Sequence, residues 1–408
     1  MIRISTDSVY QNAVTNFNNM QAEIANSINE VDTGIALSSP SVNPAAAAQV
    51  LVATQGSDVN TQYGVNGQDA SGALNTQDGI LSGVTNLLQS LESQVVEAGS
   101  GALSNTNRAT MASQFTSSLN QLLSLANSED SNGNYVFSGT TVGTQPYTAT
   151  PNGAQYNGSQ QTQMIQVDTA QQLPVNGVGS SIFGNITVSP NVYFGIANGN
   201  NTSTATISTG TLSGTGTVTG DNYSISFTSP TTYNVTDLST GAVVSTANPY
   251  TSGGTIAIPG AQFTITDGTG ANGPPATGDE FTVQPGNQNI FQVLTTLASA
   301  LNQGVSTSGD QTNLATALAQ ANTSISASLG NVLDARDQIG NSLQQIQSLS
   351  TVDSTLNVSY QTTIGTLQDV NYAQAISQLS EEQFTYQAAQ KAFASTSQLS
   401  LISMLPVT

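Results

Sequence analysis

The sequence predicts an α+β protein in which long helices at both ends of the chain pack together as a bundle or coiled coil, with β structure between them. In the first and last parts of the chain, apolar residues recur every three or four positions, which is the period of a helix with one apolar face. Between Gly133 and about Pro285 the period changes to two, and Gly, Pro and Asn residues interrupt the short runs. No apolar run approaches the roughly 20 residues of a membrane-spanning helix, so membrane insertion is not expected.

Three apolar stripes predict helices in the N-terminal part. The first contains Phe17, Met20, Ile24, Ile28, Val31 and Ile35. The second repeats two apolar positions in seven and is interrupted by one polar residue, Gln77; its members are Ala70, Leu74, Leu81, Val84, Leu88, Leu91, Val95 and Ala98. Such a narrow seam fits one partner helix, and we expect this one to be buried within the subunit. A third run extends from Met111 to Ala126.

Helical periodicity returns after Gln288. A short helix is predicted around the face formed by Ile290, Val293, Leu294 and Leu297. A long stripe follows: Ile339, Leu343, Ile346, Leu349, Val352, Leu356, Tyr360, Ile364, Leu367 and Val370. The last stretch carries Tyr372, Ile376, Leu379, Tyr386, Ala389 and Phe393. Packing these helices against the N-terminal ones is the simplest way to bury both sets of stripes.

The charge of the chain limits its partners and the way its helices are stabilised. The 408 residues include 24 acidic and four basic side chains, for a formal net charge of −20. Phosphate would repel such a chain, so nucleic acid is a poor partner. Surface ion pairs cannot support the helices, which must bury their stripes on other helices. For the terminal stripes we expect an interface between subunits or with a partner, formed by Phe17, Met20, Ile24, Ile28, Val31, Ile376, Leu379, Tyr386, Phe393, Leu399 and Leu401.

The central segment predicts a helix end, a β-hairpin and an inserted β domain. Gly133 and Asn134 favour the end of the third helix. We expect a hairpin from Gly133 to Tyr147 whose anchors on the helices are Tyr135, Phe137, Pro146 and Tyr147. Alternating runs such as Tyr223-Ile225-Phe227 predict an all-β domain over about 184–285 that projects outward. The expected parts are 1–40 with 365–408, disordered in the free monomer; 41–183 with 286–364, a helical rod; and 184–285.

Candidate catalytic and metal sites are weak. The chain has no His and no Cys, which excludes a Ser-His-Asp triad and the usual zinc ligands. Adjacent carboxylates at Asp279-Glu280 would point to opposite faces of a strand. The segment Asp130–Asn134 resembles a calcium loop but also reads as a helix C-terminus. A dyad of Ser395 with Lys391 is conceivable, although a lysine near a helix C-terminus also suits the helix dipole. We expect no cofactor, no metal and no enzymatic activity.

Several motifs, in their order along the chain, resemble the bacterial flagellin superfamily and its junction proteins between hook and filament. They are Arg3-Ile4-Ser5-Thr6, Gly133–Thr140 with Pro146-Tyr147, Gly278–Val283, and Asp369-Val370-Asn371-Tyr372-Ala373. The resemblance covers both ends and the expected hairpin; the insertion is not diagnostic. The chain departs from the family at Val42-Asn43-Pro44, where an Asp-Asp-Pro is common, although Pro44 can still open the next helix.

The resemblance implies a structural component of the flagellum, outside the cell. It implies a ring of subunits that joins hook-associated protein 1 to the flagellin filament, and a flagellar export chaperone as a further partner. Export would use the flagellar type III apparatus, since the first residues contain no apolar region of a Sec-type signal peptide. Two other functions stay open: a flagellin filament subunit, and a surface adhesin whose β insertion binds glycans.

Overall fold

The computed structural model describes residues 6–402 apart from 152, 185, 188–191, 199–200, 209, 214–221, 239, 286 and 307. The described helices are α1 (Thr6–Thr33), α2 (Pro44–Ala98), α3 (Asn105–Ala126), α4 (Gly179–Ile182), α5 (Ile290–Asn302), α6 (Ser308–Gln368) and α7 (Tyr372–Ile402). The predicted α+β class is confirmed, with long helices at both ends and strands between them. Among the described helices, none is long and apolar enough to cross a membrane.

The chain divides into two compact units. Unit 1 comprises residues 1–65 and 348–408, and unit 2 comprises residues 66–347. Helices α2 and α6 each contribute residues to both units. Each unit is described by itself below.

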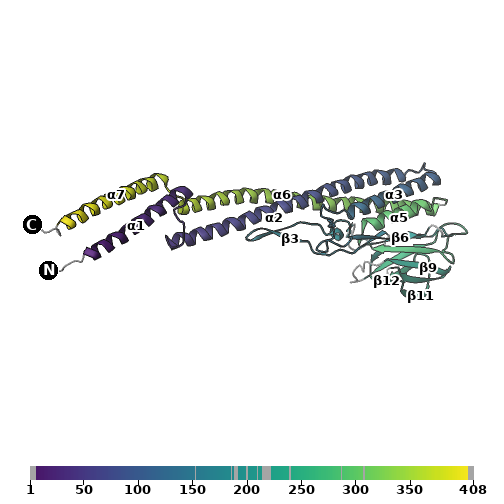
Figure 1. Cartoon of the computed structure of the whole chain (residues 1–408). Coiled ribbons are helices and arrows are strands. Elements are labelled where there is room, and N and C mark those ends of the chain that lie inside the picture. The colour runs from purple at the N-terminus through teal and green to yellow at the C-terminus, as the bar shows by residue number, and fades with distance from the viewer. Residues whose placement is uncertain are drawn as a thin grey trace, which may run out of the picture. The chain divides into compact units, whose positions relative to one another are not determined.

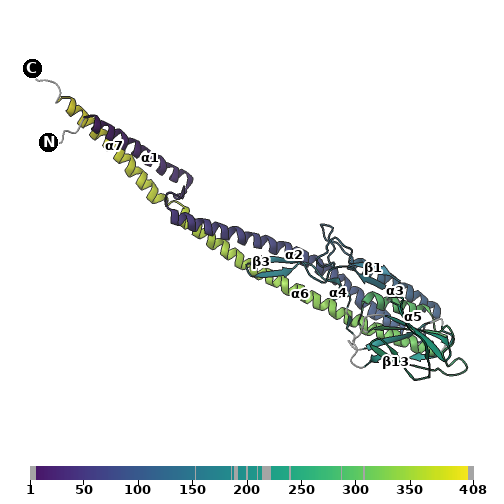
Figure 2. The ribbon, with the colours of Figure 1, turned by 90° about the horizontal axis from the view of Figure 1, so that it is seen from below.

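In unit 1, α1 and α7 lie side by side (Figures 1 and 2). They run antiparallel, because Tyr10 near the start of α1 contacts Phe393 near the end of α7, while Ile35 after α1 bridges to Asp369 before α7. The terminal seams therefore have a partner within the subunit. The terminal stripes were expected from the sequence to face another subunit or a partner, whereas in the structure α1 and α7 turn their stripes toward each other.

In unit 2, the second apolar stripe is the buried face of α2, as predicted. Each of its apolar members is almost completely buried, and so is the polar interruption, Gln77. The third helix, α3, begins at Asn105 with Ser104 as its N-cap and buries Phe115 and Leu122. It packs on α5, whose capping box at Asn289 and Gln292 starts a helix that buries all four of the residues predicted to form its inner face.

The predicted stripe of α6 is correct at Ile339 and Ile346, which are buried, and wrong at Val352 and Leu356, which are exposed. Seven residues beyond Ile346, the buried position belongs to Asp353. The inward-facing positions fall one residue after the two apolar residues that the prediction selected: Asp353 is buried and Asn357 is half-buried. A polar residue on the inner face was the unexpected feature.

The segment from Gly133 to Tyr147 is a series of turns and not a β-hairpin. Helix α3 ends at Ala126 with Asn127 as its C-cap, so the prediction that Gly133 and Asn134 end this helix was wrong. Gly133 lies in a later turn, with a φ of 79° that favours glycine. Tyr135 and Phe137 do not share a strand face: Phe137 is fully buried, whereas Tyr135 is half-exposed beside Glu129. The hairpin starts where the predicted one ends, with β1 (Tyr147–Thr150) paired to β2 (Gly153–Tyr156). A second ladder joins β3 (Met164–Asp168) to β4 (Gln171–Pro174).

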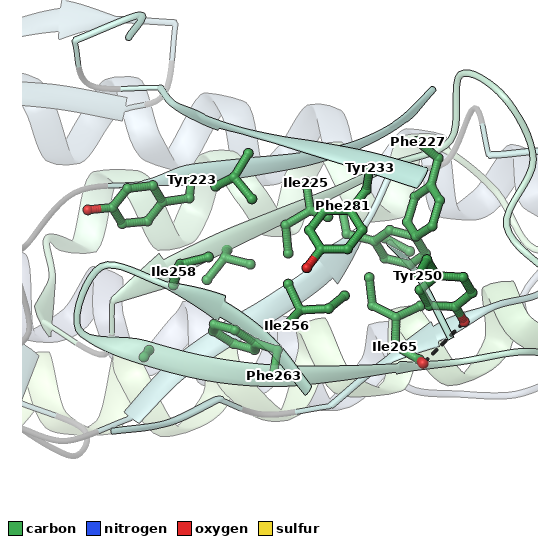
Figure 3. Packing of buried hydrophobic residues seen from close by; sticks show 14 of the residues in the cluster. Tyr223, Ile225, Phe227, Tyr233, Tyr250, Ile256, Ile258, Phe263, Ile265 and Phe281 are labelled. Carbon is green, nitrogen blue, oxygen red and sulfur yellow. Dashed lines mark hydrogen bonds between the residues drawn. The ribbon is translucent and has the colours of Figure 1, made fainter. Parts of the chain in front are cut away.

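The described strands of the inserted region form a nine-stranded antiparallel sheet in the order β11-β10-β9-β14-β6-β8-β13-β12, with β7 paired to β13. Their bounds are β6 (Val192–Ala197), β7 (Thr206–Ile207), β8 (Gly210–Leu212), β9 (Tyr223–Ser229), β10 (Thr232–Asp237), β11 (Val243–Pro249), β12 (Thr255–Ile258), β13 (Ala261–Thr266) and β14 (Glu280–Pro285). The alternating residues predicted to face one side pack into one core (Figure 3). Tyr250 closes this core by donating its hydroxyl hydrogen to Ile265 O.

The chain enters and leaves this β domain at one place. β5 (Ile186–Thr187) pairs with β15 (Asn287–Gln288), and Ile290 N donates to Phe183 O. Both ends of the insertion are thereby fixed to the start of α5. In both views the domain lies beside α5 and the adjoining part of α6 (Figures 1 and 2).

Candidate subunit interface

The turn between α1 and the rest of unit 1 is fixed by backbone contacts to the residues before α7. Gly34 follows α1 with a φ of 74°, a conformation that favours glycine at a helix C-terminus. Val370 N donates to Gly34 O, and Ala36 N donates to Gln368 O. A Cβ atom at position 34 would lie 2.8 Å from the Tyr372 hydroxyl oxygen. These contacts hold the end of α1 against the start of α7.

The facing surfaces of α1 and α7, here called the terminal seam, repeat in alternating steps of four and three. On α7 the residues turned inward are Ala375, Leu379, Glu382, Tyr386, Ala389 and Phe393. On α1 they include Phe17, Met20, Ile24, Ser27 and Val31. The ring of Phe17 lies 5.9 Å from that of Tyr386 and 5.7 Å from that of Phe393, edge-on to both, which is a favourable aromatic geometry.

Polar contacts also cross the terminal seam. Ser27 Oγ donates to Glu382 Oε2 at 2.8 Å, and Gln21 Nε2 donates to the Tyr386 hydroxyl at 2.8 Å. A polar pair in a helical seam favours one register and one orientation over others, because sliding the helices would leave both groups unpaired. The sequence stripes did not identify Ser27 or Glu382.

The residues predicted to form the subunit interface differ in where the structure places them. Most lie half-buried in the terminal seam within the subunit: Phe17, Met20, Ile24, Val31, Leu379, Tyr386 and Phe393. Ile28 and Ile376 are exposed. The side chains of Leu399 and Leu401 lie outside the described residues. A contact with another subunit is therefore open to Ile28 and Ile376 without opening the pair.

Large apolar side chains also cover the outside of the terminal pair. Phe384 is 73% exposed and Tyr10 is 57% exposed, and Val14, Ile28, Tyr372 and Ile376 are exposed as well. In a helix pair that makes no further protein contacts, the side chains at these exposed positions would ordinarily be polar. We call these six residues the outer apolar face. An apolar face on a protein surface indicates a contact with another macromolecule.

The stem segment is defined as residues 44–65 of α2 with 348–368 of α6. Its two helices meet through small and polar residues and expose large apolar ones, which is the reverse of an ordinary helix pair. Asn60 Nδ2 donates to Asp353 O, and Ser57 Oγ donates to Asn357 Oδ1 at 3.5 Å. Gly56 allows close approach of Tyr360, since a Cβ at position 56 would lie 2.8 Å from the ring. The large apolar residues point to solvent: Leu51, Val52, Val59, Val65, Val352, Leu356 and Val358.

The sequence contained a signal for this inversion. Ala46, Ala53 and Asn60 are buried and lie seven residues apart, whereas Val52 and Val59 each lie one position earlier. A search for the largest apolar residues selects the outer face and misses the small and polar residues of the inner one. Asn43 precedes this segment and accepts a hydrogen bond from Ala46 N, so it acts as the N-cap with Pro44 in the first helical position, as expected.

Of the predicted hairpin anchors, Phe137, Pro146 and Tyr147 are buried in unit 2. Phe137 packs edge-on against Phe183 at 5.3 Å, and Tyr147 packs on Phe291 at 4.7 Å. Asn127, the C-cap of α3, exchanges two hydrogen bonds with the backbone of Tyr147. This aromatic cluster ties the end of α3 to the start of α5. Phe183 and Phe291 are the members that the stripes did not identify.

The carboxylates considered as catalytic or metal ligands make local contacts. Asp279 accepts hydrogen bonds from the backbone N atoms of Thr202, Ser203 and Ala276. Burial opposes ionisation of Asp279, but these bonds hold its pKa below the usual value. Glu280 instead accepts from Ser224 Oγ and Asn198 Nδ2, so the two side chains diverge as predicted.

The calcium-like loop also makes only local contacts in the described structure. Asp130 Oδ1 accepts hydrogen bonds from the backbone N atoms of Asn132 and Asn134, which close a turn after α3. Among the described residues, no three His, Cys, Asp or Glu side chains are grouped as metal ligands.

Comparison with known proteins identifies the relatives of this chain. Residues 4–142, which contain α1, α2 and α3, match the model of the bacterial flagellin N-terminal helical region. Flagellar hook-associated protein 3 of Escherichia coli K12 is 26% identical over 404 residues, which cover 99% of both chains. The chain is thus similar to bacterial flagellins in its N-terminal helices and to hook-associated protein 3 over its whole length. The similarity to hook-associated protein 3 extends from end to end, through the β domain as well as the helices.

Solved flagellar structures support the same relationship. Flagellar hook-associated protein 3 from Legionella pneumophila is 27% identical with a TM-score of 0.56, and the match covers 78% of this chain and 98% of that one. FlgL from Xanthomonas campestris is 27% identical with a TM-score of 0.55, and the match covers 77% of this chain and 99% of that one.

A shorter sequence match is to flagellar hook-associated protein 3 of Salmonella typhimurium. It is 33% identical over 186 residues, which are 46% of this chain and 58% of that relative, so this match spans less than two thirds of the relative.

The β domain has a flagellar relative of its own. Residues 196–285 match the model of a D2-like domain of flagellar hook-associated protein 1. The matched segment contains most of the nine-stranded sheet, from within β6 to the end of β14. The insertion, which carried no diagnostic motif in the sequence, is thus related to a domain of a flagellar protein.

Proposed function

We propose that this protein is a structural component of the bacterial flagellum that connects the hook to the flagellin filament. It would contact hook-associated protein 1 on one side and flagellin on the other. The proposal rests on the end-to-end similarity to flagellar hook-associated protein 3 and on the flagellar relative of the β domain. Its role would be mechanical and non-catalytic, with no bound cofactor.

The observation that carries the mechanism is the outer apolar face of the terminal pair. The terminal seam is satisfied within the subunit, yet Phe384 and Ile376 remain exposed on the outside. Copies of the chain that pack side by side would bury these residues and the apolar side of the stem segment together. Burial of apolar surface contributes about 25 cal/mol per Å², so several such side chains per contact stabilise an assembly substantially.

The assembly we propose is a ring of identical subunits, held through the outer apolar face and extended by the stem segment. The subunit would reach the cell exterior unfolded, through the flagellar type III export apparatus. A cytoplasmic export chaperone would cover the terminal helices before export. Exposed apolar side chains on the terminal helices need such protection against premature association.

A flagellin filament subunit is the nearest alternative, because it would use terminal helices in the same way. The similarity of the whole chain to hook-associated protein 3 favours the junction role over it. A glycan-binding adhesin is a weaker alternative, because the β domain resembles a domain of hook-associated protein 1. A glycan array probed with the full-length protein tests that alternative.

Deletion of the gene tests the junction role. We expect intact hooks without filaments, and flagellin monomers shed into the medium. Restoration of filaments by the gene supplied in trans is the control. Normal filaments in the deletion strain would overturn the proposal, and bare hooks with no flagellin in the medium would favour the filament-subunit alternative.

A further inference from the structure

Unit 1 exposes two separate sets of large apolar side chains. One set lies on the outside of the terminal pair, where Phe384 and Ile376 of α7 are exposed. The other set lies on the stem segment, where Val52 and Val59 of α2 are exposed although the neighbouring Ala53 is buried. Both sets are exposed in the same subunit, so neither set covers the other within one copy of the chain.

The ring of the proposed function, on which this contact rests, needs two different surfaces on each subunit. A surface that meets the same surface of another copy gives a closed dimer. A surface that meets a different one repeats the contact from subunit to subunit, and such a series can close into a ring. The outer apolar face and the exposed side of the stem segment are two different apolar surfaces of this kind.

The two surfaces also carry charges of opposite sign. Lys391 is the one basic residue that the structure describes in unit 1, and it is exposed seven residues after Phe384, on the same side of α7. Asp58 is exposed on α2, seven residues after Leu51 and seven before Val65. Neither charged side chain forms an ion pair among the described residues. Each charge is therefore available to another copy of the chain.

We propose that the outer apolar face of one subunit packs on the exposed side of the stem segment of the next subunit. The ring of Phe384 contacts Val59 of the neighbouring copy, since aromatic side chains commonly anchor such interfaces. The ammonium group of Lys391 pairs with the carboxylate of the neighbouring Asp58. This pair sets the direction of packing, because Glu381 lies about 15 Å from Lys391 along α7 and would repel Asp58 in the reverse direction.

Cysteine cross-linking in isolated flagella tests the contact, because the chain has no cysteine of its own. Ser380→Cys places a thiol on the exposed side of α7, four residues before Phe384. Gln55→Cys places one on the exposed side of α2, four residues before Val59. The two variants carry different epitope tags and are expressed together in the deletion strain, and a short bismaleimide then joins neighbouring thiols. We expect a covalent dimer that carries both tags.

Ser93→Cys is the matched control for Ser380→Cys. Both serines are exposed, and each donates its hydroxyl hydrogen to the carbonyl oxygen four residues earlier, but Ser93 lies on α2 in unit 2. Ser93→Cys should give no dimer with Gln55→Cys.

The outcomes separate this contact from the proposed function. Flagella that contain both variants but no mixed dimer would overturn the contact and leave the junction role intact. A dimer formed by Ser380→Cys with itself would show a symmetric contact and would also overturn it. Flagella that contain neither variant would contradict the junction role, and the same cross-link in concentrated purified protein would then decide the contact.

A charge exchange between the two tagged chains tests the direction of packing. Lys391→Glu in the chain with Ser380→Cys should lower the yield of mixed dimer about threefold, as expected for loss of one exposed ion pair. Asp58→Lys in the chain with Gln55→Cys should then restore that yield. Glu381→Gln is the control, because it removes an exposed charge from α7 outside the proposed pair, and it should not lower the yield. A yield that Asp58→Lys does not restore would contradict the pairing.

Discussion

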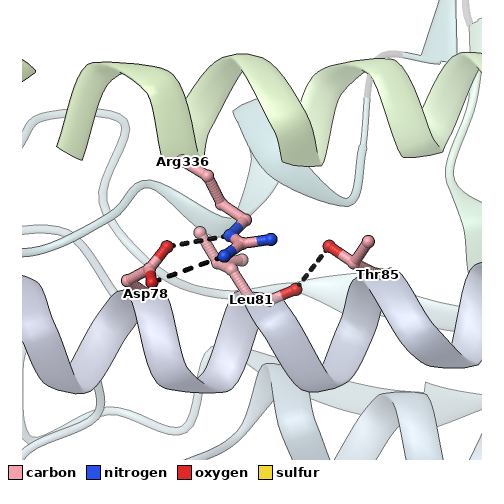
Figure 4. A network of polar contacts seen from close by, with 4 residues as sticks. All are labelled: Asp78, Leu81, Thr85 and Arg336. Atoms are coloured by element: carbon pink, nitrogen blue, oxygen red, sulfur yellow. Dashed lines mark hydrogen bonds and ion pairs between the residues drawn. The ribbon is translucent and has the colours of Figure 1, made fainter. Parts of the chain in front are cut away.

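At the scale of single residues, the two arginines of unit 2 bind different partners. Arg108 is buried, with 4% of its surface exposed, and its guanidinium donates to Ala98 O at 3.3 Å and Ser100 O at 3.4 Å. It thus caps the C-terminus of α2 from the first turn of α3. Arg336 forms a partly exposed ion pair with Asp78 (Figure 4). Hydrogen bonds from a buried charged group stabilise more than an exposed ion pair does.

Substituting methionine at each arginine should separate these two contributions. Arg108→Met keeps an apolar stem but leaves Ala98 O without its partner, and we expect it to lower the free energy of unfolding by about 2 kcal/mol. Arg336→Met should lower it by less than about 1 kcal/mol. Chemical denaturation followed by circular dichroism gives both values. Equal losses would show that the capping role is wrong.

Tyr147 combines deep burial with an unsatisfied hydroxyl group. Its ring belongs to the aromatic cluster with Phe183 and Phe291, and its hydroxyl oxygen has no partner in the described structure. Burial, together with the nearby Tyr156, raises the pKa of Tyr147 far above its usual value. The unfolded chain ionises first as pH rises, so this residue lowers the stability of the fold above about pH 10.

Tyr147→Phe should therefore stabilise unit 2. The substitution removes the unpaired hydroxyl, and we expect a gain of about 1 kcal/mol at neutral pH and a larger gain above pH 10. Thermal unfolding measured at pH 7 and pH 10.5 provides the comparison. Tyr63→Phe, at a partly exposed tyrosine, is the control. A loss of stability at neutral pH would mean that the hydroxyl has a partner in solution.

At the scale of elements, the two sides of the stem segment should have different roles. The inner side stabilises the subunit, and the exposed side is available for assembly. Val52 and Val59 lie on the exposed side of α2, while Asn60 holds the inner side by its bond to Asp353 O. Substitutions on the exposed side away from such contacts change stability by less than about 0.5 kcal/mol. The same side chains become important if neighbouring subunits cover them.

The double variant Val52→Ser, Val59→Ser should keep the helix content and stability of the monomer but reduce self-assembly at least fivefold. Val96→Ser is the matched control, since Val96 is exposed on the same helix in unit 2. Analytical ultracentrifugation of concentrated protein measures the association. Unchanged association of the double variant would exclude the stem from the interface.

The sequence predicted the elements better than their contacts. The inner faces of α2 and of β9 were predicted correctly, because in each the apolar residues recur with a clear period on one side. The prediction for the stem segment was wrong because Asp353 and Asn60 occupy its inner face, and a search for apolar residues does not find polar ones. The segment around Tyr135 failed because its turns depend on contacts with distant residues: Gly139 N donates to Gly177 O and Gly179 N to Phe137 O.

Only part of the candidate interface could be predicted from the sequence, for a related reason. Apolar stripes identified α1 and α7 as packing helices but did not separate the side that meets the other helix from the side left free. Phe384 lies outside the predicted stripe and is the most exposed of the large apolar residues of α7 whose side chains the structure describes. Periodicity identifies a face; the partner of that face depends on the fold of the whole chain.

At the scale of the whole molecule, the order of the terminal helices should depend on assembly. The large apolar residues of the terminal seam are only half-buried in the described structure, and a helix pair with so small a core is marginal in water. We expect amides of α1 and α7 to exchange rapidly in the free monomer and to become protected in assemblies. Amides of the buried stripe from Ala70 to Ala98 should be protected in both states. Strong protection of α1 in a dilute monomer would contradict this expectation.

The most direct test of the central claim is complementation of the deletion strain with the double variant Ile376→Ser, Phe384→Ser. Both residues belong to the outer apolar face and lie outside the terminal seam, so the subunit should still be exported. Electron microscopy of the cells, with immunoblots of the medium, gives the answer. The account predicts bare hooks, with the variant and flagellin both in the medium. Full-length filaments on cells that carry the variant would contradict it.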